Sequence, residues 1–162
     1  MITTERSIEV AAPADQVWGV LGRFMHIDEF HPRVTKVDAL SGAEAGLGAK
    51  RRCHFKDGTS VVEEVVEWNP GRSYRAELSG FSLPLNKAIA TLGVEPLDAQ
   101  RSRATMSMDY RVQYGPFGWL MGKTMMARMM GKLFLVILHG LEARVLCSNP
   151  EAARAKSSAH VA

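Results

Sequence analysis

The residue of this chain best suited to proton transfer is His31. It stands between Phe30 and Pro32 in the segment IDEFHPRV. An unperturbed imidazole titrates near neutral pH, so His31 is a candidate general acid or base. A histidine exposed on a loop, with no chemical role, is the simpler alternative.

Metal and nucleotide chemistry find little support in the sequence. His26 and His31 share a short stretch with Asp28 and Glu29, but side chains five residues apart on a helix point in different directions, whereas metal ligands at i and i+4 converge. The two cysteines form neither a disulfide framework nor a metal-binding spacing. Glycine-rich phosphate-binding motifs are also absent from the sequence. We therefore predict no metal and no cofactor.

A predicted hairpin brings an arginine and a glutamate together. Asp57-Gly58 lies between two strand-like runs and favours a two-residue type I′ loop. Counting outward from that loop pairs Arg51 with Glu64, and it makes Arg52 and Glu63 a surface pair. The more apolar face of the hairpin should be the inner one, and it carries Cys53, Phe55, Val62, Val66 and Trp68. Arg51 and Glu64 are then predicted to point inward.

A buried arginine and a buried glutamate require each other, because either charge alone in an apolar interior costs several kcal/mol. The pair Arg51–Glu64 has two interpretations. It is a structural ion pair, or it is a polar anchor inside a ligand cavity, in which case Glu64 is a second candidate for acid–base chemistry.

The elements that must position these side chains follow from the apolar pattern. Thr3–Val10 is typical of a strand, and two short helices are predicted after Pro13 and over Phe24–Phe30. Six further strand-like runs follow, separated by turn signals: Val34–Leu40, Ala49–Phe55, Thr59–Trp68, Ser73–Ser79, Asn86–Val94 and Ser102–Val112. This order predicts an antiparallel meander.

The closing segment Phe117–Leu146 contains no proline and predicts one long helix. It is apolar beyond a single stripe, so something must largely enclose it. Lys123, Arg128 and Lys132 interrupt it, so we predict no stable membrane insertion, while contact with a membrane interface stays open. The small polar residues at 149–162 predict a flexible tail.

Four stretches carry a resemblance to a known family: IEVAAPADQVWGVLGRF, IDEFHPRV, VVEEVVEWNPGRSYRAEL and the closing helix. They resemble the START-like helix-grip fold of the SRPBCC superfamily, which includes polyketide cyclase/dehydrase-like proteins. The resemblance covers about residues 3–146. Members often carry Trp before the proline of the P-x-V segment, where this chain has His31.

The resemblance implies an α+β fold in which a curved antiparallel seven-stranded sheet wraps around a long C-terminal helix, with two short helices after the first strand. It also implies a single domain over residues 1–148 and a cavity for a small hydrophobic ligand. Members bind lipids, sterols, polyketides, plant hormones or quinones, and some are cyclases or aromatases.

We therefore expect a cytoplasmic protein that binds a hydrophobic or aromatic ligand between sheet and helix. The expected ligand-binding residues are Phe30, Arg51, Phe55, Val62, Val66, Trp68, Tyr74, Met106, Met108, Tyr110, Phe117, Met121, Met125 and Met129. One alternative is a polyketide cyclase, aromatase or dehydratase that uses His31 or Glu64. Another is an interaction protein that uses the apolar closing helix, for example to form a homodimer. With a net charge of +3 and no basic stripe among aromatics, nucleic acid is not an expected partner.

Overall fold

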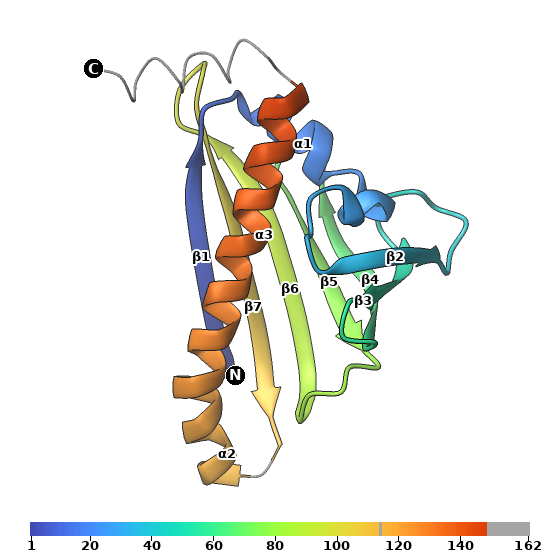
Figure 1. Ribbon diagram of the computed structural model, residues 1–162, viewed down its shortest axis with the longest axis vertical. Coiled ribbons are helices and arrows are strands. Elements are labelled where there is room, and N and C mark those ends of the chain that lie inside the picture. The colour runs from blue at the N-terminus through green and yellow to red at the C-terminus, as the bar shows by residue number, and fades with distance from the viewer. Residues whose placement is uncertain (114, 149–162) are drawn as a thin grey trace.

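The computed structural model describes residues 1–113 and 115–148, so the predicted tail at 149–162 lies outside the described residues. Seven strands form one antiparallel sheet in the order β1-β7-β6-β5-β4-β3-β2 (Figure 1). The strands are β1 (Ile2–Val10), β2 (Val34–Ala39), β3 (Lys50–Phe55), β4 (Ser60–Asn69), β5 (Ser73–Ser79), β6 (Leu85–Pro96) and β7 (Ser102–Val112). The predicted meander of β2 to β7 is confirmed, and β1 extends the open sheet by pairing with β7.

Two short helices follow β1, as predicted. They are α1 (Ala14–Leu21), which begins after Pro13, and the 3-10 helix η1 (Phe24–Glu29). A helix cannot continue easily through the residue before a proline, and η1 ends shortly before Pro32. Figure 1 shows η1 beside β2, while α1 lies near the end of the long C-terminal helix.

The predicted C-terminal helix is present but not uniform. It consists of α2 (Gly115–Met121), a π-helical segment η2 (Gly122–Met126) and α3 (Ala127–Ser148). α3 runs along β1 and β7 (Figure 1). Its buried side recurs every three or four residues and consists of Met130, Phe134, Ile137, Leu138, Leu141 and Val145.

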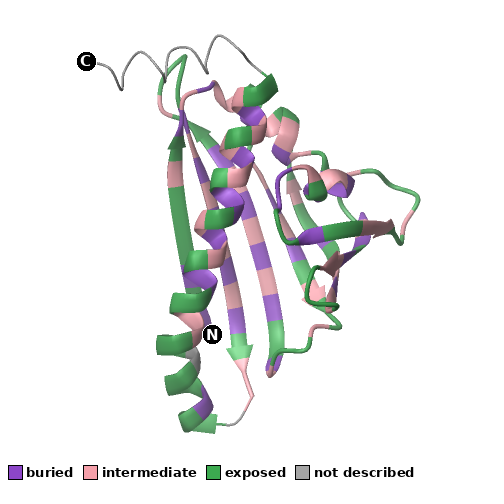
Figure 2. Cartoon of the chain, viewed as in Figure 1, coloured by how far each residue is buried: buried purple, intermediate pink, exposed green. Residues whose placement is uncertain are grey.

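Along β6 and β7 buried residues of the inner face alternate with half-buried residues of the outer face (Figure 2). Met106, Met108 and Tyr110, three of the expected ligand-binding residues, are buried on this inner face. Tyr74 of β5 is also buried. A β-bulge between Val65 and Glu67 shifts the β4–β5 register by one residue, and this shift turns the apolar residues of β5 toward the inner face.

The predicted register of the β3–β4 hairpin is wrong by one residue. The Phe55 N–H donates to the Thr59 carbonyl at 2.9 Å, so three residues rather than two form the loop. Gly58 has a φ of 84°, which the αL position of such a loop needs. Arg51 consequently pairs with Glu63 instead of Glu64.

This shift exchanges the two faces of β4, because side chains alternate with a period of two. Glu64 lies outside and forms an ion pair with Lys50 at 3.1 Å, so its predicted inward direction is wrong. Val62 is half-buried on the outer side, and Val66 is 43% exposed at the bulge. The predicted surface pair of Arg52 and Glu63 is also wrong.

Candidate functional site

A buried ion pair forms the centre of the site. The Arg51 side chain is fully buried, and its Nε–H donates to Glu63 Oε2 at 2.6 Å. Nη2 forms an ion pair with the same oxygen, and Nη1–H donates to the Phe24 carbonyl. The guanidinium also lies 3.9 Å from the centre of the Phe24 ring. These contacts offset the cost of removing the charges from water.

The position of Arg51 follows from the strand alternation of β3. Arg51 and Cys53 take successive inward positions, and the ring of Phe24 at the start of η1 lies against the Arg51 guanidinium. Burial alone lowers the pKa of Arg51, but the charge and hydrogen bond of Glu63, together with Tyr74 and Cys53, outweigh it, and the net pKa lies above the ordinary value. Arg51 is therefore charged at every pH at which the protein is folded.

Tyr74 of β5 brings a phenol to this pair. Its ring stacks on Trp68 with centroids 5.8 Å apart and meets the edge of Phe24 at 5.6 Å. Burial raises its pKa to about 12, so the hydroxyl keeps its proton. The Arg51 guanidinium acts on this buried hydroxyl from close by, but no group among residues 1–113 and 115–148 meets the geometry of a hydrogen bond with it. Leaving such a group unsatisfied costs about 1–3 kcal/mol.

His31, between η1 and β2, is only 6% exposed. The interpretation of His31 as an exposed loop residue is therefore wrong. Its Nδ1 accepts a hydrogen bond from the Arg33 backbone N–H at 3.3 Å, which leaves the proton of the neutral ring on Nε2. Burial lowers the pKa of His31 to about 4, partly opposed by Glu63 and reinforced by Arg51. The imidazole is neutral at neutral pH.

Cys53 completes the polar cluster. Its Sγ lies 3.9 Å from Glu63 Oε2, and burial raises the pKa of the thiol to about 12. A thiol with so high a pKa is a poor nucleophile. Within the described ranges, no group of three or more His, Cys, Asp and Glu side chains is arranged to hold a metal ion.

Small side chains continue the inner face from this cluster toward α3. Ala76 of β5 pairs with Ala90 of β6, and Ala90 pairs with Met108 of β7. Thr4 of β1 pairs with Met108 in turn, and its buried Oγ1 has no hydrogen-bond partner among the described residues. Two unsatisfied hydroxyls, those of Thr4 and Tyr74, therefore lie on the inner face, with apolar side chains of β5, β6 and β7 between them.

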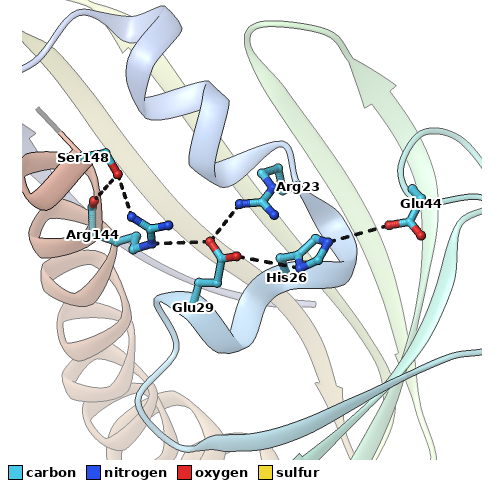
Figure 3. A network of polar contacts seen from close by, with 6 residues as sticks. All are labelled: Arg23, His26, Glu29, Glu44, Arg144 and Ser148. Atoms are coloured by element: carbon cyan, nitrogen blue, oxygen red, sulfur yellow. Dashed lines mark hydrogen bonds and ion pairs between the residues drawn. The ribbon is translucent and has the colours of Figure 1, made fainter.

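An ionic network connects η1 to α3 and to the β2–β3 loop (Figure 3). Glu29 of η1 accepts contacts from Arg23 at 3.0 Å and from Arg144 of α3 at 3.4 Å. His26 lies 3.8 Å from Glu29 and from Glu44 of the β2–β3 loop. The network ties η1 to α3, although partly exposed pairs of this kind each contribute at most about 1 kcal/mol.

Close packing adds to this attachment. A Cβ placed on Gly140 of α3 would come closer than 3.0 Å to the carbonyl oxygen of Phe30. Only glycine lets the helix approach the backbone at the end of η1 so closely.

The predicted site residues separate into two groups. The first group is buried on the inner face and consists of Arg51, Tyr74, Met106, Met108 and Tyr110. Phe30 is buried beneath α3. Phe55 is half-buried against His31, and Trp68 is half-buried against Tyr74. The structure does not bring Glu64, Val62, Val66, Phe117, Met121, Met125 or Met129 to this group; Val62 is half-buried on the outer face and the others are exposed. The residue that sequence reasoning missed is Glu63. The Gly58 that permits a three-residue loop was the one signal for it.

Comparisons with solved structures show the same fold and so confirm the predicted helix-grip arrangement of sheet and C-terminal helix. The Zhui aromatase/cyclase from Streptomyces sp. R1128 has a TM-score of 0.74 at 18% identity, over 89% of this chain and 93% of that chain. The di-domain ARO/CYC BexL from the BE-7585A biosynthetic pathway has a TM-score of 0.76 at 21% identity, over 93% of this chain and 48% of that chain. A protein from Thermobifida fusca has a TM-score of 0.73 at 26% identity, over 92% of this chain and 96% of that chain.

The sequence itself identifies the family. Residues 1–146 match the model of the family described as polyketide cyclase / dehydrase and lipid transport, so the chain belongs to that family. A comparison with curated proteins gave no significant match.

Proposed function

We propose that the protein binds a small hydrophobic ligand on the inner face of the sheet beneath α3, with an oxygen atom of the ligand at the Tyr74 hydroxyl. The observation that carries this proposal is that hydroxyl, which is buried beside Arg51 while no group in the described structure meets hydrogen-bond geometry with it. A ligand carbonyl or hydroxyl that accepts its proton removes the penalty of an unsatisfied group. Membership of a family described by polyketides and lipids supports a ligand of this type.

The donors of the site favour an acceptor oxygen on the ligand. Arg51 already donates to Glu63 and to the Phe24 carbonyl, so Tyr74 is the donor left for a ligand, and the nearby guanidinium charge favours a polarised oxygen there. The alanines and methionines beside it offer only apolar contact. The ligand class is therefore an apolar or aromatic skeleton that carries carbonyl or hydroxyl groups.

Thr4 suggests the length of that ligand. Its orphan hydroxyl on β1 lies three strand spacings from Tyr74 on β5, roughly 14 Å across the sheet. A ligand with oxygens at both ends of such a span satisfies both hydroxyls. Thr4→Val is expected to weaken only ligands that have the second oxygen.

Binding measurements with matched ligands test the proposal. Affinities are measured by titration calorimetry for a fatty acid, a quinone and a polyphenol, each beside an analogue in which hydrocarbon replaces the oxygen. Tyr74→Phe should lower the affinity for the oxygenated ligand about five- to tenfold and leave the hydrocarbon analogue unchanged. Because the substitution removes an unsatisfied group, the fold should keep its stability. Absence of binding to the whole panel, or equal loss for both analogues, rejects the proposal.

A second candidate function is an enzyme of the cyclase, aromatase or dehydratase type. The observation that favours it is His31, which burial keeps neutral beside Arg51 and Glu63. Because Nδ1 accepts from the Arg33 N–H, the neutral imidazole offers its Nε2–H as a donor. Together with the Tyr74 hydroxyl it would stabilise the enolate oxygen that develops in a substrate of this reaction class. Glu64, on the outer face, takes no part in this proposal.

Turnover of an aromatising polyketide mimic tests the second candidate. His31→Asn should lower kcat at least 100-fold if the Nε2–H of the imidazole stabilises the enolate oxygen, whereas the outward-facing Glu64→Gln serves as the control and should retain full activity. Equal activity in the wild type and in His31→Asn removes the histidine from any such mechanism.

A further inference from the structure

The first half of the C-terminal helix exposes a set of large apolar side chains. Figure 2 shows the α2 end of the helix as mostly exposed, and Figure 1 shows it extending past the end of β7. Phe117 is 73% exposed and Met125 is 65% exposed. The full set, which we call the apolar edge, consists of Phe117, Trp119, Leu120, Met121, Met125 and Met129. Exposed apolar groups gathered this closely mark an interaction surface.

The apolar edge continues onto a neighbouring loop. The Pro84 carbonyl between β5 and β6 accepts a hydrogen bond from the Gln113 N–H at 3.0 Å, which places this loop beside the start of α2. Leu83 in the loop is exposed, and so is Met1, which precedes the pairing of Ile2 with Tyr110 at the same end of β7. Three separate segments therefore present apolar groups at one end of the molecule.

The charges around the apolar edge have one sign. Between residues 112 and 141 the sequence contains no Asp or Glu. The same stretch carries Lys123, Arg128 and Lys132, all exposed. The Lys123 Nζ lies 4.8 Å above the centre of the Trp119 ring, so cation and aromatic face share one surface.

We propose that the apolar edge docks the protein on the surface of an anionic lipid bilayer. Aromatic and aliphatic groups on one side of a helix, with lysine and arginine beside them, suit insertion into the boundary between headgroups and acyl chains. A second copy of the chain fits less well, because a two-fold contact through this edge would bring three cations of each copy together. Within the described residues, no helix is long and apolar enough to cross a membrane, which agrees with attachment to the surface only.

Vesicle co-sedimentation tests the proposal on the intact chain, independently of the ligand site. The wild type is mixed with neutral phosphatidylcholine vesicles and with vesicles containing about one third phosphatidylglycerol. Binding should be at least tenfold stronger to the anionic vesicles and should fall with added salt, because each cation near such a surface contributes about a fivefold factor at low ionic strength. Phe117→Ser/Met125→Ser should lower binding at least tenfold.

Matched variants distinguish binding through the apolar edge from nonspecific binding of exposed apolar or basic groups elsewhere on the protein. Leu47→Ser removes an equally exposed apolar group from the β2–β3 loop and should leave vesicle binding unchanged. Lys123→Glu/Lys132→Glu should abolish the preference for anionic lipid, whereas Lys56→Glu on the β3–β4 loop should not. No binding to anionic vesicles overturns the proposal, and so does equal binding by the wild type and the Phe117→Ser/Met125→Ser variant. A third outcome also overturns it: the wild type sediments as a dimer, the double variant sediments as a monomer, and neither binds vesicles.

Discussion

Acidification should destabilise the protein through His31. Its folded-state pKa of about 4 lies below the ordinary value of 6.5 because the ring is buried. The unfolded chain therefore binds this proton more readily than the folded chain does. Above pH 6.5 the histidine is neutral in both states and has no effect. As pH falls from 6.5 toward 4, the free energy of unfolding decreases, and below 4 the loss is complete.

The size of the effect follows from the two pKa values. A shift from 6.5 to about 4 corresponds to a total loss of about 3 kcal/mol. Between pH 7 and pH 5 the expected loss is about 2 kcal/mol, because most of the unfolded chains but few of the folded chains are then protonated. Three charged groups act on the His31 ring besides its burial: Arg51 and Arg33 lower its pKa, and Glu63 raises it.

Urea denaturation at pH 7 and pH 5 measures this loss in the wild type and in His31→Asn. The asparagine amide oxygen can replace Nδ1 as acceptor for the Arg33 N–H but does not titrate. His31→Asn should therefore lose about 2 kcal/mol less than the wild type between the two pH values, while carboxylates contribute equally to both. His139→Asn, at an exposed position of α3, should behave as the wild type. An equal loss in the wild type and in His31→Asn refutes the assignment of a low pKa to the buried ring.

Two further predictions concern stability and need only denaturation curves. Gly140→Ala should cost about 2–4 kcal/mol, because its Cβ would overlap the rigid Phe30 carbonyl. Gly131→Ala meets only a flexible side chain and should be neutral or stabilising by up to about 1 kcal/mol; equal losses would show that α3 does not rest on that carbonyl. Arg51→Met should cost about 3–5 kcal/mol because it leaves Glu63 unpaired, and Arg51→Met/Glu63→Leu should recover most of that loss. Failure of the second change to recover stability contradicts the mutual dependence of the pair.

The sequence predicted the order of the elements well because their signals are local. Proline before α1, turn residues between strands and the uninterrupted apolar helix each depend on a few neighbouring residues. The inward direction of Arg51 was predicted for the same reason, since one strand fixes its own parity. The partner of Arg51 was not, because the length of a single loop decides it, and Asp57-Gly58 is compatible with loops of two or three residues.

The site chemistry was less accessible to sequence reasoning because burial depends on the whole fold. His31 sits in a segment rich in polar residues, and nothing local shows that its ring packs against Phe55. The surroundings of the Tyr74 hydroxyl likewise come from segments distant in sequence, since Phe24 of η1 and Arg51 of β3 lie beside it. Its neighbours in three dimensions, rather than its neighbours in the chain, make it a candidate ligand contact.

The exposure of the methionines, by contrast, follows from lengths alone. A helix from Gly115 to Ser148 has 34 residues and spans roughly 50 Å. The 11 residues of β7 span roughly 37 Å. About nine helical residues must therefore extend past the strand on which the helix packs, and Phe117–Met125 is a stretch of that length. An apolar helix that encloses a cavity over its whole length would need a longer sheet, so the excess apolarity of this end requires a partner outside the domain.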